Sequence, residues 1–220
     1  MQKKIESYIF EAGGDVFIDV GANVGMWAKE LYGDYNKIYF IEPSSKAMDL
    51  AVEQIFDPEN KIVFLQNLCS SESGVTKNIY SPSDDTGNFS IYAKDLYEEK
   101  LGIKQSENDI DTIMVDDLLD QITEGSRILL KVDTEGHDLD VLLGAKELIK
   151  KFRPTVCIEL HFHMHYDEQK YKEVFDLFES LNYSRQDFKS NWYNGPALVD
   201  GKHTGDQMYD LHYQVLMTPN

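Results

Sequence analysis

The sequence predicts an α/β fold in which helices cover both faces of a mostly parallel sheet. Short apolar runs alternate with helical patterns, the runs are apolar almost throughout, and a glycine-rich turn follows the first run. The 220 residues are enough for one domain with a sizeable core. We therefore expect residues 1–220 to form a single domain.

The predicted elements follow one another in the order that such a domain requires. Strands are expected at Val16–Val20, Ile38–Ile41, Ile62–Gln66, Ile128–Val132, Thr155–Leu160 and Leu211–Met217. Helices are expected at Val24–Leu31, after Pro43, between the fourth and fifth strands, and at Tyr171–Leu181. Strands connected through helices in this way are parallel neighbours in one sheet.

Residues 70–111 interrupt this alternation. They are polar and rich in turn residues, with short strands expected near Lys77–Tyr80 and Asn88–Tyr92. In α/β folds, a long insertion after the carboxyl end of a strand often forms a lid or a substrate loop. We predict such a lid or substrate insertion here, with a solvated surface excursion as the alternative.

The charge of the chain argues against several kinds of partner. The formal net charge is -18 and the chain has only three arginines. Nucleic acids and anionic membranes bind through clustered Lys and Arg, so neither is expected as a partner.

No run is long enough to span a bilayer, no signal-peptide core begins the chain, and Cys69 and Cys157 lie in apolar runs. We expect a cytoplasmic protein.

A glycine turn directly follows the first predicted strand. Its members are Gly21, Ala22, Asn23, Val24 and Gly25. Glycine permits a sharp turn and the close approach of a ligand, and the helix that follows presents free N–H groups. Asp19, near the strand end, either orders the turn or contacts an ammonium group.

An acidic residue completes the pattern of a nucleoside site. The second predicted strand ends at Glu42, 21 residues after Gly21, and a carboxylate there accepts both hydroxyls of a ribose. Asn67, at the end of the third strand, is a candidate for contact with an adenine edge. The alternative is a structural turn with a solvated glutamate.

The turn departs from the G-x-G-x-x-G pattern of dinucleotide sites. Asn23 stands in place of the second glycine, and no third glycine follows at the expected spacing. A nucleoside that carries methionine has no phosphates, and its ammonium and carboxylate need mixed donors and acceptors. These features favour S-adenosylmethionine over NAD. An NAD-linked oxidoreductase and a non-catalytic nucleoside-binding protein remain alternatives.

Longer blocks of the sequence resemble the FkbM-type family of S-adenosylmethionine-dependent methyltransferases. The blocks are Phe17–Gly25, Tyr39–Pro43 and Lys131–Gly136, with weaker support from Asp111–Leu119 and Arg153–Glu159. The resemblance implies a Rossmann-like class I methyltransferase fold with a seven-stranded sheet and the cofactor at the glycine turn. It also implies an O-methyl acceptor, such as a sugar or another small-molecule hydroxyl. It places Asp133 near the reacting methyl group or near the methionine end of the cofactor.

The fourth predicted strand delivers two carboxylates to the same edge of the sheet. Asp133 and Glu135 follow Ile128–Val132, and both are candidate catalytic residues. For Glu135 the alternative is a favourable charge at a helix N-terminus. Lys131, inside the strand, needs a partner for its charge, and we expect Asp116 or Asp117.

The fifth strand runs into a histidine-rich segment, Glu159-Leu-His-Phe-His-Met-His165. His161 is our predicted general base, because a neutral imidazole titrates near working pH, and the rate should then fall near pH ~6.5. A metal ion held by some of Asp133, Glu159, His161 and His163 is the competing mechanism. We expect no metal.

Overall fold

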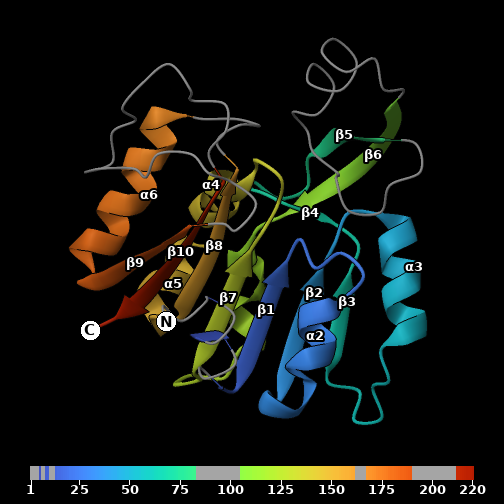
Figure 1. The fold of residues 1–220 in the computed structure, drawn as a ribbon, viewed down its shortest axis with the longest axis horizontal. Coiled ribbons are helices and arrows are strands. Elements are labelled where there is room, and N and C mark those ends of the chain that lie inside the picture. The colour runs from blue at the N-terminus through green and yellow to red at the C-terminus, as the bar shows by residue number, and fades with distance from the viewer. Residues whose placement is uncertain (1–4, 6–7, 10–12, 83–104, 162–166, 190–211) are drawn as a thin grey trace.

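The centre of the molecule is a seven-stranded sheet, seen in a computed structural model that describes residues 5, 8–9, 13–82, 105–161, 167–189 and 212–220 (Figure 1). The strand order is β3-β2-β1-β7-β8-β10-β9. The strands are β1 (Val16–Val20), β2 (Lys37–Ile41), β3 (Ile62–Leu65), β7 (Ile128–Val132), β8 (Thr155–His161), β9 (Tyr183–Lys189) and β10 (His212–Pro219). β10 is antiparallel to both β8 and β9, and the remaining pairs are parallel. The predicted mostly parallel sheet is confirmed.

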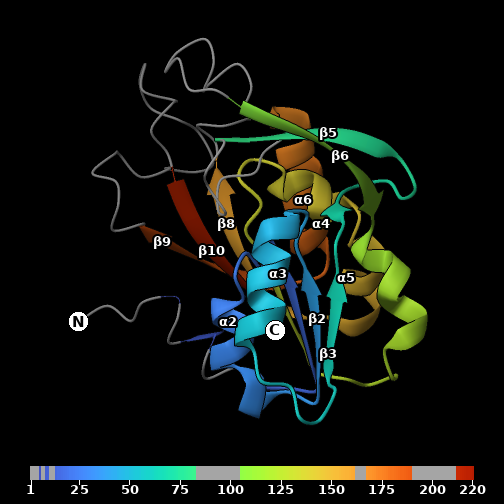
Figure 2. The ribbon, with the colours of Figure 1, turned by 90° about the vertical axis from the view of Figure 1, so that its right-hand side faces the viewer.

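Helices cover both faces of this sheet (Figure 2). The helices are α2 (Met26–Glu30), α3 (Ser45–Gln54), α4 (Asp138–Leu143), α5 (Lys146–Phe152) and α6 (Glu168–Ser180), and the short 3₁₀ helices are η1 (Tyr32–Asp34) and η3 (Val115–Gln121). Alternate residues of β1 face opposite ways. Ile18 packs in the core under α4, α5 and α6, while Phe17 packs in the core under α2 and α3. Each such fully buried side chain stabilises the fold by about 1.5–3 kcal/mol.

Local chemistry sets the helix boundaries. The Ser44 hydroxyl accepts a hydrogen bond from the Ala47 N–H at 3.1 Å, so α3 begins directly after Pro43 and Ser44. The single helix expected between β7 and β8 is two helices, α4 and α5, separated near Gly144. A Cβ on Gly144 would lie 2.0 Å from the Ser70 carbonyl oxygen, so the neighbouring backbone passes close to the chain here.

The interruption after β3 contains a second, smaller sheet. Its strands are β4 (Leu68–Cys69), β5 (Thr76–Pro82) and β6 (Gln105–Ile113), in the order β4-β6-β5. Figures 1 and 2 show this sheet beyond the carboxyl ends of β2 and β3. The strand expected at Lys77–Tyr80 falls within β5, whereas Asn88–Tyr92 lies outside the described residues. The role of this insertion as a lid stays a prediction.

Within the described part of the chain, no helix has the length and apolar character needed to cross a bilayer.

Candidate active site

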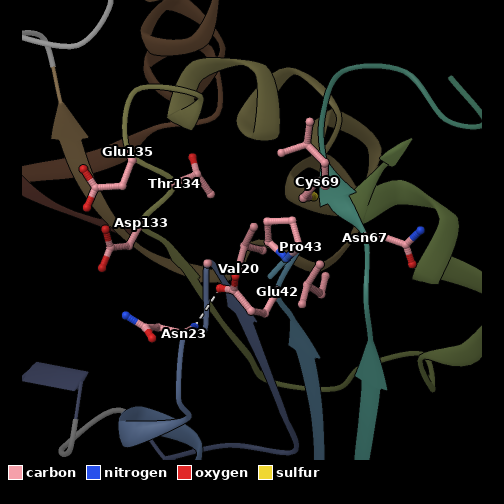
Figure 3. A pocket seen from close by; sticks show the side chains of 12 residues that line it. Val20, Asn23, Glu42, Pro43, Asn67, Cys69, Asp133, Thr134 and Glu135 are labelled. Atoms are coloured by element: carbon pink, nitrogen blue, oxygen red, sulfur yellow. Dashed lines mark hydrogen bonds between the residues drawn. The ribbon is translucent and has the colours of Figure 1, made fainter. Parts of the chain in front are cut away.

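A cavity opens at the carboxyl ends of β1, β2 and β7, where the strand order reverses direction (Figure 3). In open α/β sheets this switch point is the usual place for a ligand. The predicted residues that line it are Gly21, Asn23, Glu42, Asn67, Asp133 and Glu135. Val20, Ile41, Pro43, Leu68, Cys69 and Thr134 complete the lining. Four predicted residues, Asp19, Ala22, Gly25 and His161, do not line it.

Glu42 presents a fixed carboxylate to the cavity from the end of β2. The side chain is only 5% exposed, and its two oxygens accept hydrogen bonds from the Asn23 and Ser44 N–H groups, each at 2.8 Å. Burial raises the pKa of Glu42 to about 7, against the lowering effect of these two hydrogen bonds. Each oxygen keeps further acceptor capacity for a ligand hydroxyl.

Asn23 supplies the most direct sign of a polar ligand. Its backbone is left-handed, with φ of +50°, and its N–H is bound to Glu42. Its side-chain Oδ1 is buried and accepts no hydrogen bond from the described residues. A buried acceptor of this kind is costly unless a donor reaches it, and the ammonium group of a methionine-bearing nucleoside is such a donor. On the far side, the Asn67 amide donates to the Asp111 carbonyl of β6 at 3.2 Å.

The two glycines of the turn serve the packing of the chain. Gly21 has φ of +72°, and a Cβ there would lie 1.8 Å from the Asp133 carbonyl oxygen. Gly25 has φ of +82°, and a Cβ there would lie 2.5 Å from Ile55. Gly21 also lines the cavity, so our expectation that it lets a ligand approach stays a prediction. The structure adds that it lets the ends of β1 and β7 approach each other. Ala22 is buried in the core under α2 and α3.

Lys131 and Asp19 form a buried ion pair beneath the cavity. They are register partners on β7 and β1, and the Lys131 Nζ lies 3.1 Å from Asp19 Oδ1. Lys131 also donates to the Gly21 carbonyl at 3.3 Å and lies 3.5 Å from Asp133 Oδ2. Burial alone would lower the pKa of Lys131, but Asp19 and Asp133 raise it above its usual range. Asp19 therefore stabilises the glycine turn through Lys131, which bonds to the Gly21 carbonyl.

The partners we predicted for Lys131 were wrong. Asp116 accepts hydrogen bonds from the Glu147 and Leu148 N–H groups at the start of α5. Asp117 accepts one from the Met114 N–H. Both carboxylates therefore accept hydrogen bonds from backbone N–H groups at the starts of helices and do not pair with Lys131. The register of β1 against β7, which a single sequence does not specify, decides which carboxylate meets Lys131.

The second predicted group gathers around His161. Its side chain is 4% exposed and lies behind the cavity wall. His161 Nε2 lies 3.7 Å from Asp133 Oδ1 and 3.7 Å from Glu135 Oε2. Figure 3 shows these two carboxylates on the same side of the loop that follows β7. Glu135 has φ of +50°, an uncommon conformation for a residue other than glycine, so this loop holds its side chain at a conformational cost.

Asp138 fixes the orientation of the imidazole. Its Oδ2 lies 3.2 Å from His161 Nδ1, and its Oδ1 accepts hydrogen bonds from both the N–H and the hydroxyl of Thr134 at 2.8 Å. Sequence reasoning missed this residue. Its place in the first turn of α4 indicates only a favourable negative charge at a helix N-terminus. Its contact with β8 depends on tertiary packing.

The charges around His161 disfavour the predicted general base. Burial alone would lower the pKa of His161, but Asp138, Glu135 and Asp133 together raise it to about 10. The three carboxylates thus favour the protonated imidazole, which does not accept a proton from a hydroxyl. The expected fall in rate near pH 6.5 loses its basis for the same reason. Burial raises the pKa of Asp133, against the opposing charges of Lys131 and His161.

A potential metal-ligand group includes part of this cluster. Asp133, Glu159 and His161 each offer one ligand atom, and the three atoms lie within 4.8 Å of one another. The Glu159 carboxylate also accepts a hydrogen bond from the Gln214 amide of β10 at 3.2 Å. His163 and His165 lie outside the described residues.

The sequence comparison identifies the family. The methyltransferase FkbM domain matches residues 19–185, which is most of the chain. This chain belongs to the FkbM methyltransferase family. A search of curated proteins finds no match. Membership favours a methyltransferase over an NAD-linked oxidoreductase, and the family indicates S-adenosylmethionine as the cofactor.

Solved structures show the class I methyltransferase fold. The FkbM methyltransferase from Methylobacillus flagellatus KT has a TM-score of 0.54 at 16% identity, over 92% of this chain and 43% of that one. A putative methyltransferase from Streptococcus mutans, solved in complex with S-adenosylhomocysteine, has a TM-score of 0.52 at 9% identity and full coverage of both chains. An rRNA methylase from Streptococcus thermophilus has a TM-score of 0.51 at 9% identity, over 100% and 98% of the two chains. This FkbM chain spans less than half the length of the Methylobacillus protein.

Proposed function

We propose that this FkbM protein is an O-methyltransferase whose acceptor is a hydroxyl on a small polyhydroxylated molecule such as a sugar. One observation carries the proposal: the cavity that holds Glu42 at one end is bordered at the other end by the carboxylates of Asp133 and Glu135. The first end suits a ribose. The second suits hydroxyl groups, which donate hydrogen bonds to carboxylates.

The residues of the first end fit S-adenosylmethionine, which when bound supplies an electrophilic methyl group on sulfur. Glu42 would accept hydrogen bonds from the two ribose hydroxyls. The buried Oδ1 of Asn23 would accept from the methionine ammonium group. Asn67, across the cavity, would meet the adenine edge.

The residues of the second end would hold the acceptor and remove its proton. Asp133 contacts two cations, Lys131 and His161, so its carboxylate is well placed to orient a hydroxyl. Glu135, in the loop beside the cavity, lies near the same imidazole. We propose Glu135 as the general base that accepts the proton of the hydroxyl. As that proton leaves, the oxygen attacks the methyl carbon, and sulfur keeps the electron pair of the broken bond. The His161 imidazolium holds both carboxylates in place.

The charge of the chain supports a small acceptor over a nucleic acid. The net charge is -18, and the acceptor end of the cavity adds carboxylates where a phosphate backbone would need cations. The similarity to an rRNA methylase is one of fold.

The proposal is tested by following S-adenosylhomocysteine release with a panel of sugars and polyols, and with oligonucleotides as a separate arm. We expect turnover with at least one polyhydroxylated acceptor and none with oligonucleotides. Glu135→Gln should lower turnover by ~10²–10⁴-fold with cofactor affinity unchanged. The exposed Glu124→Gln is the matched control and should leave turnover unchanged. Turnover with oligonucleotides, or full activity of Glu135→Gln, would contradict the proposal.

A further inference from the structure

We propose that Asp133, Glu159 and His161 bind a divalent metal ion of the Mn²⁺ or Mg²⁺ type beside the methyl-donor cavity. This inference rests on the proposed function, and it departs from the metal-free site that we expected from the sequence. It names the group that would bind the acceptor oxygen directly.

The three residues offer a mixed set of ligands from two adjacent strand ends. Asp133 follows β7, while Glu159 and His161 lie in β8, and their ligand atoms all fall within 4.8 Å of one another. Two ligands on opposite sides of Mg²⁺ lie about 4.2 Å apart, given metal–oxygen distances of ~2.1 Å. Small side-chain movements therefore bring all three atoms to one ion. Two carboxylates with one imidazole suit Mn²⁺ or Mg²⁺ better than a site that is rich in sulfur or nitrogen.

The surroundings of His161 have the organisation of a metal ligand. Asp138 lies against Nδ1 at 3.2 Å, which directs Nε2 toward Asp133. Metal-bound histidines typically contact a carboxylate through the nitrogen that does not bind the metal. Thr134 holds Asp138 through two further hydrogen bonds, so the orientation is fixed before any ion arrives. Glu159 is held in a comparable way by Gln214.

The charge balance points to a cation as well. Five carboxylates meet here: Asp19, Asp133, Glu135, Asp138 and Glu159. Lys131 and His161 face these carboxylates, and His161 would bind the ion as a neutral imidazole after Nε2 releases its proton. Carboxylates outnumber these two basic groups, and an excess of negative charge at a partly buried site favours the binding of a cation. A divalent ion supplies that positive charge.

The ion would also explain how a weakly acidic hydroxyl is activated. Asp133 lines the cavity, so an ion on its carboxylate has an open position toward the acceptor. A bound divalent cation lowers the pKa of an oxygen that it coordinates. Glu135, which is outside the ligand set, then receives the proton and the oxygen attacks the methyl carbon.

The test is Mn²⁺ binding to the full chain, followed by electron paramagnetic resonance and calorimetry after EDTA treatment and desalting. We expect one ion per chain in the wild type and at least a 10-fold weaker affinity in Glu159→Gln, which keeps an oxygen for Gln214 to bind. Glu179→Gln, an exposed carboxamide substitution on α6, is the matched control and should bind Mn²⁺ like the wild type. Circular dichroism confirms that each variant is folded.

Two results would overturn the metal site: no Mn²⁺ binding to the wild type, with or without S-adenosylhomocysteine, or wild-type affinity in the folded Glu159→Gln variant. S-adenosylhomocysteine binding is measured on the same metal-free samples. If the nucleoside binds and Mn²⁺ does not, the metal site fails and the proposed function stands. If the nucleoside does not bind, the proposed function fails on its own evidence.

Discussion

The two ends of the active-site cavity are built in different ways. At the nucleoside end, one carboxylate, Glu42, is held by two backbone N–H groups, and the chain around it turns through left-handed positions. At the acceptor end, the ionisable side chains of β7, α4, β8 and the loop after β7 are held in place by ion pairs with one another. The first design depends on backbone geometry close in sequence, and the second on charge balance across the sheet.

The largest expected effect breaks the charge balance. Lys131→Met removes the cation that joins the two ends and leaves the fully buried Asp19 without its partner. Breaking a buried ion pair in this way typically costs ~3–5 kcal/mol. Chemical denaturation should show this loss in the free energy of unfolding. Asp19→Asn combined with Lys131→Met should recover part of it, and a loss under ~1 kcal/mol in the single variant would contradict the account.

The next effect tests backbone geometry at the nucleoside end. Gly21→Ala combines a strained dihedral with a collision against the Asp133 carbonyl, and we expect a loss of ~3 kcal/mol or more. Gly74 is the matched control, because it has the same φ of +72° and a Cβ added there would have no atom within 4 Å. Gly74→Ala should therefore cost only the dihedral strain of ~1–2 kcal/mol. Equal losses in both variants would show that close packing at Gly21 is unimportant.

Acid should act in opposite directions on Glu42 and on His137, a buried histidine directly before α4. Burial lowers the pKa of His137 to about 4, so the unfolded chain takes up a proton first and this contribution to stability is lost between pH ~6.5 and ~4. Burial raises the pKa of Glu42 to about 7, so the folded chain takes up a proton first and this contribution grows between pH ~7 and ~4.5. Each is worth up to about 3 kcal/mol.

Denaturation at several pH values separates these two contributions. Relative to the wild type, His137→Gln should lose less stability on acidification, whereas Glu42→Gln should lose more. His137 contacts Ser70 at 3.0 Å, so its variant reports on the contact between the insertion and the loop before α4. Parallel pH profiles for the wild type and both variants would contradict these assignments.

The same contrast explains what the sequence could predict. The glycine turn, Glu42 and the strands β1, β2, β7 and β8 follow from local patterns, and each lies where it was expected, whereas β9 was not predicted. The pairing of Lys131 with Asp19 and the contact of Asp138 with His161 depend on strand register and on how α4 meets β8. The same limit applies to His161, because three carboxylates from other elements raise the pKa of its imidazole and a single sequence does not show that they meet there.

Binding of S-adenosylhomocysteine by calorimetry at pH 8 tests the central claim most directly, because Glu42 is then ionised. The account predicts that the wild type binds and that Glu42→Gln binds ~10- to 100-fold more weakly, since a charge-assisted pair of ribose hydrogen bonds contributes about 1.5–3 kcal/mol. The exposed Glu53→Gln variant on α3 should bind like the wild type. Unchanged affinity in a folded Glu42→Gln variant would contradict the placement of the cofactor in this cavity.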